Sequence, residues 1–397
     1  MRPIVLRSMS AVSCLGVGLQ AHVESLLAQR CALHRCDFET VQLDTYIGEA
    51  AGVDRERLPA ALARFESRNN RLAQLALSQP EFREAVAGSV RRYGAGRLGV
   101  FLGTSTSGML ETEIAYRGRD PVTGLLPASF NYAGSHNFYS VAAFTRELLG
   151  LQGPAAVVST ACSSSAKVFG MAARMIRLGL IDGAIVGGAD SLCLTTLYGF
   201  HSLQLTSSTP CRPFDVHRDG ISVGEAAAFA LLDADADEGK HTGVTLLGIG
   251  ESSDAYHLST PHPEGLGARM AMQAALAAAE LEPSAIDYIN LHGTGTISND
   301  SAEGRAVAAV FGNSTRCSST KGASGHTLGA AGALEAVICA LAIQRGFMPG
   351  GVNCQQLDPG CTINYLRRNE SIGPRHVLSN SFGFGGSNCS LVFGALT

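Results

Sequence analysis

Apolar residues follow two patterns along the chain: short apolar runs, and two long stretches that are apolar on nearly every side. The short runs GAIVGG, AAFALL and VTLLGI are typical of strands buried on both faces. The long stretches cover residues 166–179 and 328–346, and each ends in a basic residue near a glycine, as helices often do. Helices that are apolar all round lie inside a protein. Strands alternating with such helices predict an α/β fold with central buried helices.

Similar landmarks recur in the same order in the two halves of the chain. An apolar run ends in Gly-Thr-x-Thr at Gly103 and again, 190 residues later, at Gly293. Ser-Thr pairs begin at Ser159 and, 160 residues later, at Ser319, and each pair precedes one of the apolar helices. The polar, acidic segment 233–243 lies between the halves. We therefore predict two related halves, residues 1–240 and 241–397.

Composition excludes several classes of function. Of 397 residues, 46% are hydrophobic and only 16% are charged, which predicts a large core and a buried subunit interface. The net charge of −4 and the absence of a Lys/Arg block argue against nucleic-acid binding. We expect no membrane span, because no run of about 18 uninterrupted apolar residues exists, and no signal peptide, because the N-terminal apolar run is short.

The eleven cysteines are odd in number and scattered, with no C-x-x-C pair. This arrangement predicts reduced thiols in the cytoplasm and no zinc site. Taken alone, any one of them is more often a small buried hydrophobe than a reactive group.

Cys162 differs from the other cysteines in its position. It lies between a predicted strand at 155–158 and the apolar helix at 166–179, among small residues. A thiol at a helix N-terminus feels the positive end of the helix dipole, which stabilises the thiolate. Free backbone N–H groups at the same end can hold an oxyanion. Cys162 is therefore a candidate nucleophile.

Two histidines in the second half lie in similar glycine-rich turns. His292 opens HGTGT, and His326 ends KGASGH. A lone histidine is usually structural, but two histidines in matching turns of a duplicated fold favour function. We expect both to work with Cys162.

The motifs TACSSSA, RPFDVHRDG, LHGTGT, KGASGHTLGAAGALE and SNSFGFGGSN occur in this order. Together they resemble the elongating β-ketoacyl-acyl carrier protein synthases of types I and II, which belong to the thiolase superfamily. The match runs from about residue 95 to the end of the chain, and more weakly includes AVSCLG at 11–16. The resemblance implies a thiolase-like duplicated five-layered αβαβα fold.

The resemblance also implies roles for particular residues. The family has a nucleophilic cysteine, two catalytic histidines, a lysine and an acid, and these correspond to Cys162, His292 and His326, Lys321, and Glu335. It also has a phenylalanine whose N–H joins the oxyanion hole and whose ring gates the acyl pocket, and this corresponds to Phe384. The phosphopantetheine arm of an acyl carrier protein would bind Thr294 and Thr296, and the acyl tail would lie near Thr106, Met109 and the Phe384 ring.

The implied reaction is a decarboxylative Claisen condensation of an acyl group held on Cys162 with malonyl-acyl carrier protein. Two neutral imidazoles would stabilise the enolate, and Lys321, taken to lie beside His326, would disfavour an imidazolium by like-charge repulsion. No metal and no cofactor is implied apart from the phosphopantetheine of the carrier. The implied assembly is a dimer with a second copy or with a chain-length-factor homologue.

Three departures from the family pattern bear on the pathway. CSSSA is serine-rich, Ala226 replaces a common glycine, and the first strand lacks Gly-x-Gly. These departures favour a dedicated type II pathway, such as an aryl polyene or polyketide one. A thiolase is an alternative, but its second cysteine does not match Cys389. A catalytically silent subunit is another, but the retained cysteine, histidines and lysine argue against it.

Three further features bear on the site and its surroundings. Glu335 either acts directly or is a buried acid tied to Lys321. RPFDVHRDG predicts an architectural ion-pair network through Arg212, Asp215, Arg218 and Asp219. A helix at 64–72 would place Arg64, Arg68 and Arg71 on one face. This face is either a docking site for an acidic carrier protein or an ordinary solvated or interface surface.

Overall fold

The first half of the chain forms a five-stranded sheet. The computed structural model describes residues 4–234 and 241–396. Within the first half the strand order is β6-β5-β7-β9-β1; the strands are β1 (Ile4–Ser13), β5 (Leu98–Gly103), β6 (Ala155–Val158), β7 (Gly183–Asp190) and β9 (Ala226–Asp233). β5 pairs in parallel with β6 and β7, whereas β9 runs antiparallel to β7 and β1.

The second half repeats this topology. Its order is β12-β11-β14-β15-β10, with β13 (Asn364–Tyr365) added at the edge; the strands are β10 (Val244–Ser253), β11 (Tyr288–Asn290), β12 (Arg316–Ser318), β14 (His376–Gly383) and β15 (Ser387–Ala395). β11 pairs in parallel with β12 and β14, and β15 runs antiparallel to β14 and β10. The same order and the same directions confirm the predicted duplication.

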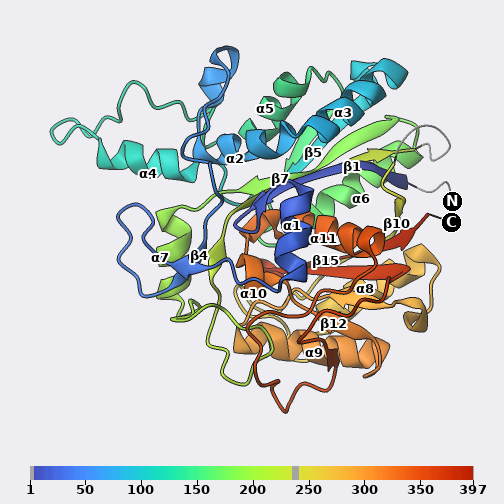
Figure 1. Cartoon of the computed structure of the whole chain (residues 1–397). Helices are drawn as coiled ribbons and strands as arrows, with labels where there is room; N and C mark the ends of the chain where they lie inside the picture. Colours follow the sequence, from blue (N-terminus) through green and yellow to red (C-terminus); the bar gives the residue numbers. More distant parts are fainter. Residues whose placement is uncertain (1–3, 235–240, 397) are drawn as a thin grey trace.

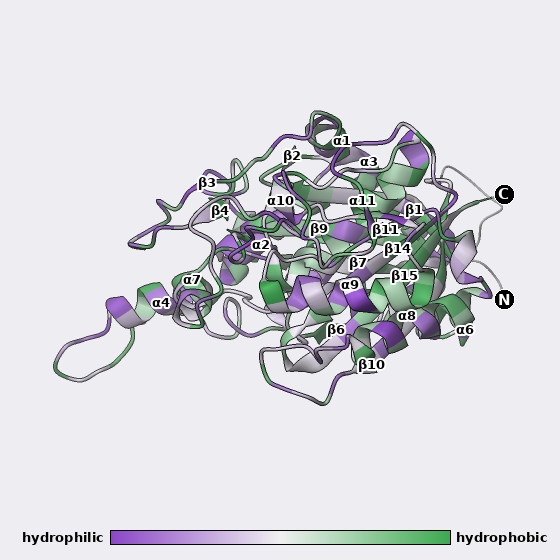
Figure 2. Cartoon of the chain, turned by 90° about the horizontal axis from the view of Figure 1, so that it is seen from below, coloured by the Kyte–Doolittle hydropathy of each residue, from purple (hydrophilic) through white to green (hydrophobic). Residues whose placement is uncertain are grey.

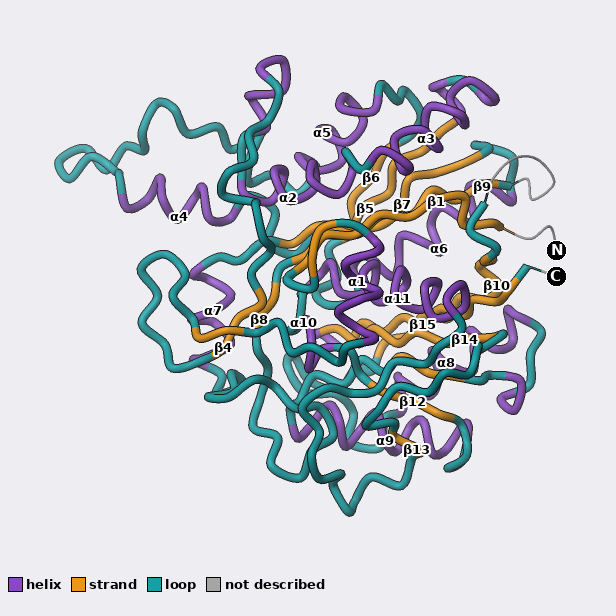
Figure 3. Tube along the Cα trace, viewed as in Figure 1, coloured by secondary structure: helices purple, strands orange, loops and turns teal. Residues whose placement is uncertain are grey.

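Among the described residues, the two five-stranded sheets are hydrogen-bonded to each other through β1 and β10. β1 and β10 pair antiparallel through Ile4–Leu246 and Val5–Thr245. Elsewhere the sheets separate into two layers, which Figure 3 shows as two bands of strands. The predicted boundary at residue 240 falls among residues 235–240, outside the described residues.

Two helices fill the space between the sheets: α6 (Ser164–Arg177) and α11 (Ala331–Arg345). They are the predicted apolar helices, and the residues of α11 from Ala331 to Ala342 are all buried. A Cβ at Gly332 of α11 would lie 2.7 Å from the backbone nitrogen of Ala166, so glycine permits the close crossing of the two helices.

Helices also cover the outer faces, which completes the five layers (Figure 1). The first sheet is covered by α2 (Arg68–Leu77), α3 (Pro80–Tyr93) and α5 (Ser140–Leu149), and the second by α8 (Leu266–Ala279) and α9 (Ile297–Phe311). The five-layered α/β fold is therefore confirmed.

Smaller elements complete the described part of the chain. They are β2 (Gly16–Val17), α1 (Leu19–Leu27), β3 (His34–Arg35), β4 (Tyr46–Gly48), α7 (Leu194–Ser202), β8 (Val223–Gly224) and α10 (Lys321–Ser324). In addition, α4 (Met109–Arg117) and the loop after it project from the body beside α7 (Figure 2).

Candidate active site

Cys162 lies in a tight turn between β6 and α6. Ala161 has φ 51°, an unusual value for a residue with a side chain, and Cys162 follows it two residues before the helix begins. The end of β14 approaches this turn closely, because a Cβ at Gly383 would lie 2.7 Å from the carbonyl oxygen of Thr160. The backbone N–H of Phe384 is thereby directed at Sγ of Cys162.

The thiol of Cys162 is neutral at rest. Burial raises its pKa to about 11, although the Lys321 charge and the Phe384 N–H act in the opposite direction. Burial thus acts against the stabilised thiolate that the sequence predicts, whereas the Lys321 charge and the Phe384 N–H favour it. The proton therefore has to leave as the sulfur attacks. Nε2 of His326, 3.0 Å from Sγ, is positioned to accept it.

His292 and His326 face each other beside the thiol. Their ring centroids are 5.2 Å apart and the rings are nearly perpendicular. Burial, together with the positive charge of Lys321, lowers the pKa of both rings well below 6.5. Both imidazoles are therefore neutral, as the sequence predicted.

Lys321 contacts His292 and not His326, which corrects the expected pairing. Its Nζ lies 3.3 Å from Nδ1 of His292 and forms an ion pair with Oε1 of Glu335. An ammonium group can only donate, so Nδ1 of His292 is the acceptor and the ring proton resides on Nε2. The charge still disfavours an imidazolium at both histidines.

Glu335 lies behind the site on α11. It contacts Lys321, and burial raises the pKa of its carboxyl to about 7. The residues that line the cavity at Cys162 include neither Glu335 nor Lys321. These contacts favour the interpretation of Glu335 as a buried acid that holds Lys321 over a direct role in the reaction.

The cavity at Cys162 brings six of the predicted residues together. Its lining includes Cys162, His292, His326, Phe384, Thr294 and Thr296. The hydroxyl oxygens of the two threonines are 3.0 Å apart, and Thr296 also caps α9. Their hydroxyls are thus available on the wall that an extended arm would follow.

Thr106 and Met109 do not line this cavity. The Thr106 backbone N–H and hydroxyl both donate to Asp190, and the side chain is fully buried. Met109 begins α4 and packs against the apolar cluster that contains Leu197. Their place at the acyl tail stays a prediction.

Two buried carboxylates support the site and were missed by the sequence reasoning. Both oxygens of Glu303 accept backbone N–H groups, from His292 at 2.8 Å and from Gly293 at 2.7 Å. Asp190 accepts hydrogen bonds from the segment 104–106 and from Gly329. For Asp190 the available signal was an acidic residue at the end of the apolar run GAIVGGAD, whereas Glu303 lies among polar residues in SNDSAEGR and offered no such signal.

The donor atoms of Cys162, His292 and His326 all lie within 4.8 Å of one another. A nitrogen-nitrogen-sulfur set of this size has the chemistry of a site for a thiophilic metal ion. The sequence predicts catalysis without a metal, and a chelator tests that prediction below.

The RPFDVHRDG segment forms ion pairs, as expected. Arg218 pairs with Asp358 at 2.6 Å and with Asp300 at 3.7 Å, and Arg212 lies 3.9 Å from Asp219. The carboxylate of Asp215 accepts the N–H groups of residues 217, 355 and 356. These contacts fasten loops together, which is an architectural role.

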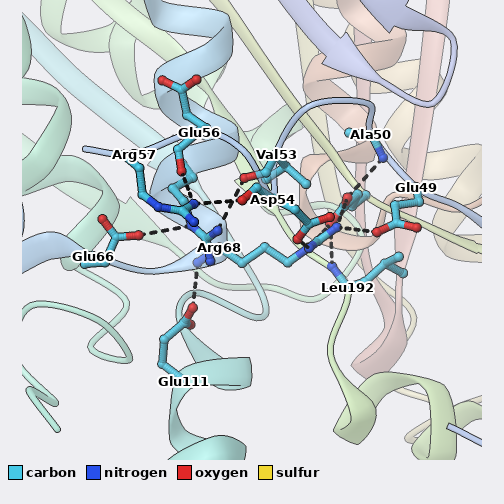
Figure 4. A network of polar contacts seen from close by, with 12 residues as sticks. Glu49, Ala50, Val53, Asp54, Glu56, Arg57, Glu66, Arg68, Glu111 and Leu192 are labelled. Atoms are coloured by element: carbon cyan, nitrogen blue, oxygen red, sulfur yellow. Dashed lines mark hydrogen bonds and ion pairs between the residues drawn. The ribbon is translucent and has the colours of Figure 1, made fainter. Parts of the chain in front are cut away.

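The predicted basic stripe does not exist. Arg68 begins α2 and its side chain is only 3% exposed, because it pairs with Glu225, Glu49 and Asp54 (Figure 4). Arg64 precedes the helix and pairs with Glu147. The spacing predicts that the three arginines share one helical face, but the side chain of Arg68, the central one, points into the protein.

Comparison with known proteins identifies the family. Residues 1–238 match the model of the beta-ketoacyl synthase N-terminal domain, and residues 244–355 match that of the C-terminal domain. The chain therefore belongs to the β-ketoacyl synthase family of the thiolase superfamily.

Curated relatives are similar over part of their length. Nodulation protein E of Rhizobium leguminosarum bv. trifolii is 39% identical over 256 residues, which are 62% of this chain and 62% of that protein. The 3-oxoacyl-[acyl-carrier-protein] synthase 2 of Staphylococcus aureus is 32% identical over 322 residues, 75% of this chain and 77% of that protein.

Solved structures are similar over the whole chain. A ketosynthase in complex with its chain length factor from Xenorhabdus doucetiae superposes with a TM-score of 0.90 at 35% identity, over 99% of this chain and 98% of that chain. The ishigamide ketosynthase/chain length factor gives a TM-score of 0.89 at 27% identity, over 99% of each chain.

Within the described residues, one helical segment is long and apolar enough to cross a membrane. It runs from Leu328 to Arg345, and 83% of it is buried inside the protein. This is the central helix α11 with the turn before it, and it belongs to the core.

Proposed function

We propose that the protein is a β-ketoacyl-acyl carrier protein synthase, an acyltransferase that joins an acyl group on Cys162 to malonyl-acyl carrier protein. The observation that carries the proposal is the set of contacts around one cavity. These are the Cys162–His326 contact of 3.0 Å, the facing ring of His292, and Lys321 behind that ring.

Acylation is the first step. Sγ of Cys162 attacks the carrier thioester, a new Sγ–C bond forms, and the bond to the pantetheine sulfur breaks. The thiol proton passes through Nε2 of His326 to the leaving sulfur. Nδ1 of His326 is buried without a hydrogen-bond partner among the described residues, so none of them fixes its tautomer. Nε2 of His326 can therefore accept a proton in this step and donate a hydrogen bond in the next.

Decarboxylation and condensation follow. The malonyl C–C bond breaks, CO2 leaves, and the electron pair forms an enolate whose oxygen accepts hydrogen bonds from Nε2–H of both histidines. The enolate carbon then attacks the acyl carbonyl. The N–H groups of Cys162 and Phe384 hold the tetrahedral oxyanion. Its collapse breaks the Sγ–C bond and releases the thiolate, which takes up a proton from solvent.

The proposed partners are an acyl carrier protein, whose phosphopantetheine would lie along Thr294 and Thr296, and a second subunit. That subunit is either another copy of this chain or a chain-length-factor homologue. The likeness to two ketosynthase/chain length factor structures and the departures in sequence favour a dedicated type II pathway. All eleven cysteines are free thiols, which suits the cytoplasm.

The thiolase alternative has no support in the site. Its second cysteine would have to reach the reacting atoms, but Cys389 is fully buried in β15 and does not line the cavity.

Intact-mass analysis tests the proposal. We expect one acyl group on the wild-type chain after incubation with an acyl carrier, and release of a β-ketoacyl carrier after malonyl carrier is added, with or without a chelator. An acyl group on Cys162→Ala would contradict the choice of nucleophile, and transfer only from acyl-CoA would contradict the acyl carrier as substrate. Loss of activity with the chelator would contradict catalysis without a metal.

A further inference from the structure

The N-terminus of α7 is held by a carboxylate from another element. Oε2 of Glu113, on α4, accepts the N–H of Leu194 at 2.9 Å. Oε1 accepts the N–H of Thr195 at 2.7 Å and its hydroxyl at 2.5 Å. A negative charge at this position satisfies free N–H groups and complements the helix dipole.

α7 has no local substitute for this contact. Its own N-cap residue is Cys193, whose side chain makes no capping hydrogen bond, although its φ of −153° and ψ of 159° are those of an N-cap. Glu113 therefore supplies from α4 what a serine or aspartate at residue 193 would supply locally. The two helices lie side by side in both Figure 1 and Figure 2.

α7 carries one wall of the catalytic cavity. Leu197 is fully buried and anchors the middle of the helix. One turn later, Phe200 lines the cavity, and its ring centroid lies 5.7 Å from that of Phe384. A shift or fraying of the first turn of α7 would therefore change how Phe200 meets Phe384.

We propose that Glu113 is a positioning residue that determines acyl specificity: by capping α7, it sets Phe200 against Phe384 and so limits which acyl groups reach Cys162. This proposal rests on the proposed function. Glu113 touches neither the substrate nor the reacting atoms, and it acts only through α7.

The test compares two primers. In Glu113→Ala the wall formed by Phe200 loosens, so kcat/KM for octanoyl carrier relative to acetyl carrier should rise about 5-fold, the scale of a lost helix cap. The higher ratio should come from a lower KM for octanoyl carrier. The rate at which iodoacetamide alkylates Cys162 should stay unchanged. An unchanged ratio would overturn the proposal.

Two further variants separate positioning from general damage. Cys193→Ser in the Glu113→Ala background places a local cap on α7 and should restore the wild-type ratio. Glu84→Ala removes an exposed ion pair with Arg91 on α3 and should leave the ratio unchanged. Failure of the serine to restore the ratio would mean that Glu113 acts by another route.

Amide hydrogen exchange tests whether Glu113 caps α7, and it needs no measurement of catalytic activity. The N–H groups of Leu194 and Thr195 should exchange faster in Glu113→Ala, and also in Glu113→Gln if the alanine variant does not fold. Equal protection in wild type and variant would overturn the proposal. If α7 loosens as expected but the wild-type protein forms no acyl-enzyme, the proposed function fails and the role of Glu113 as a cap stands.

Discussion

The contact with Lys321 decides which nitrogen of His292 carries the proton. By donating to Nδ1, it leaves the proton on Nε2, where an enolate oxygen would need a donor. Glu335 in turn holds the ammonium group in place, and Glu303 holds the backbone at His292. Three buried ionisable side chains thus orient one neutral ring.

Removal of either histidine should impair decarboxylation more than acylation. In His292→Ala and in His326→Ala, we expect the formation of acetyl carrier from malonyl carrier to fall on the order of 10²-fold, because each variant loses one oxyanion donor. Acyl loading of Cys162 should fall less. His34→Ala, at an exposed position, is the control. Rates equal to wild type in both variants would refute the enolate-stabilising role.

At the scale of residues, the sequence predicts the reacting groups better than the groups that orient them. Cys162, His292 and His326 lie in recognisable motifs, and the structure brings them to one cavity. Asp190 binds backbone groups of residues 104–106 and 329, which are far away in sequence, and Glu303 binds backbone groups 10 and 11 residues before it, so the spacing typical of a helix or strand reveals neither set of contacts. Arg68 shows the reverse: its spacing was correct, but burial beside Glu225 determines its role.

At the scale of elements, the crossing of α6 and α11 fixes the nucleophile relative to the helix that carries Glu335. Ala166 of α6 and Gly332 of α11 meet at the crossing, four residues after Cys162 and three before Glu335. The closeness of the helices is therefore part of the site's geometry.

Two glycines inside helices should respond in opposite directions to alanine. Gly332→Ala should lower the free energy of unfolding by about 1–3 kcal/mol, because the added Cβ is forced against Ala166. Gly88→Ala in α3, where the nearest atom to the Cβ would be the tip of Arg91 at 3.7 Å, should raise it by about 0.5–1 kcal/mol. Chemical denaturation measures both, and a stabilised Gly332→Ala would contradict the close crossing.

The elements themselves were largely predictable. The predicted strand at 155–158 coincides with β6, and the predicted helix at 166–179 is observed at Ser164–Arg177. Helix 328–346 begins later, at Ala331, because residues 328–330 form a separate 3-10 turn. The capping of α7 by α4 was not predictable, because it depends on where a projecting helix folds back.

At the scale of the whole molecule, β6 leaves one edge of the first sheet open. The carbonyl groups of Pro154 and Val158 accept N–H groups from the β5 side, so the alternation of the backbone turns the N–H of Val157 to the open edge. An open apolar edge is a template for pairing with another chain. The loop beyond α4 adds exposed apolar side chains: Val122, Leu125 and Tyr132.

We expect the active protein to be a dimer that pairs through this edge. Val157→Pro removes an outward N–H while leaving the bonds to β5, so it should shift the protein towards monomer. Light scattering after size exclusion at micromolar concentration measures the shift. A wild-type chain that is monomeric and fully active, alone and with a chain-length-factor homologue, would contradict the dimer.

The central claim is that Cys162 carries the acyl group and that the two histidines then decarboxylate the extender. Mass spectrometry of the intact chain and of the carrier, sampled in one reaction, measures both events. The account predicts an acyl adduct confined to Cys162 that disappears as β-ketoacyl carrier forms, and no adduct in Cys162→Ala. An adduct that persists in Cys162→Ala, or β-ketoacyl product formed without any adduct on the wild-type chain, would contradict it.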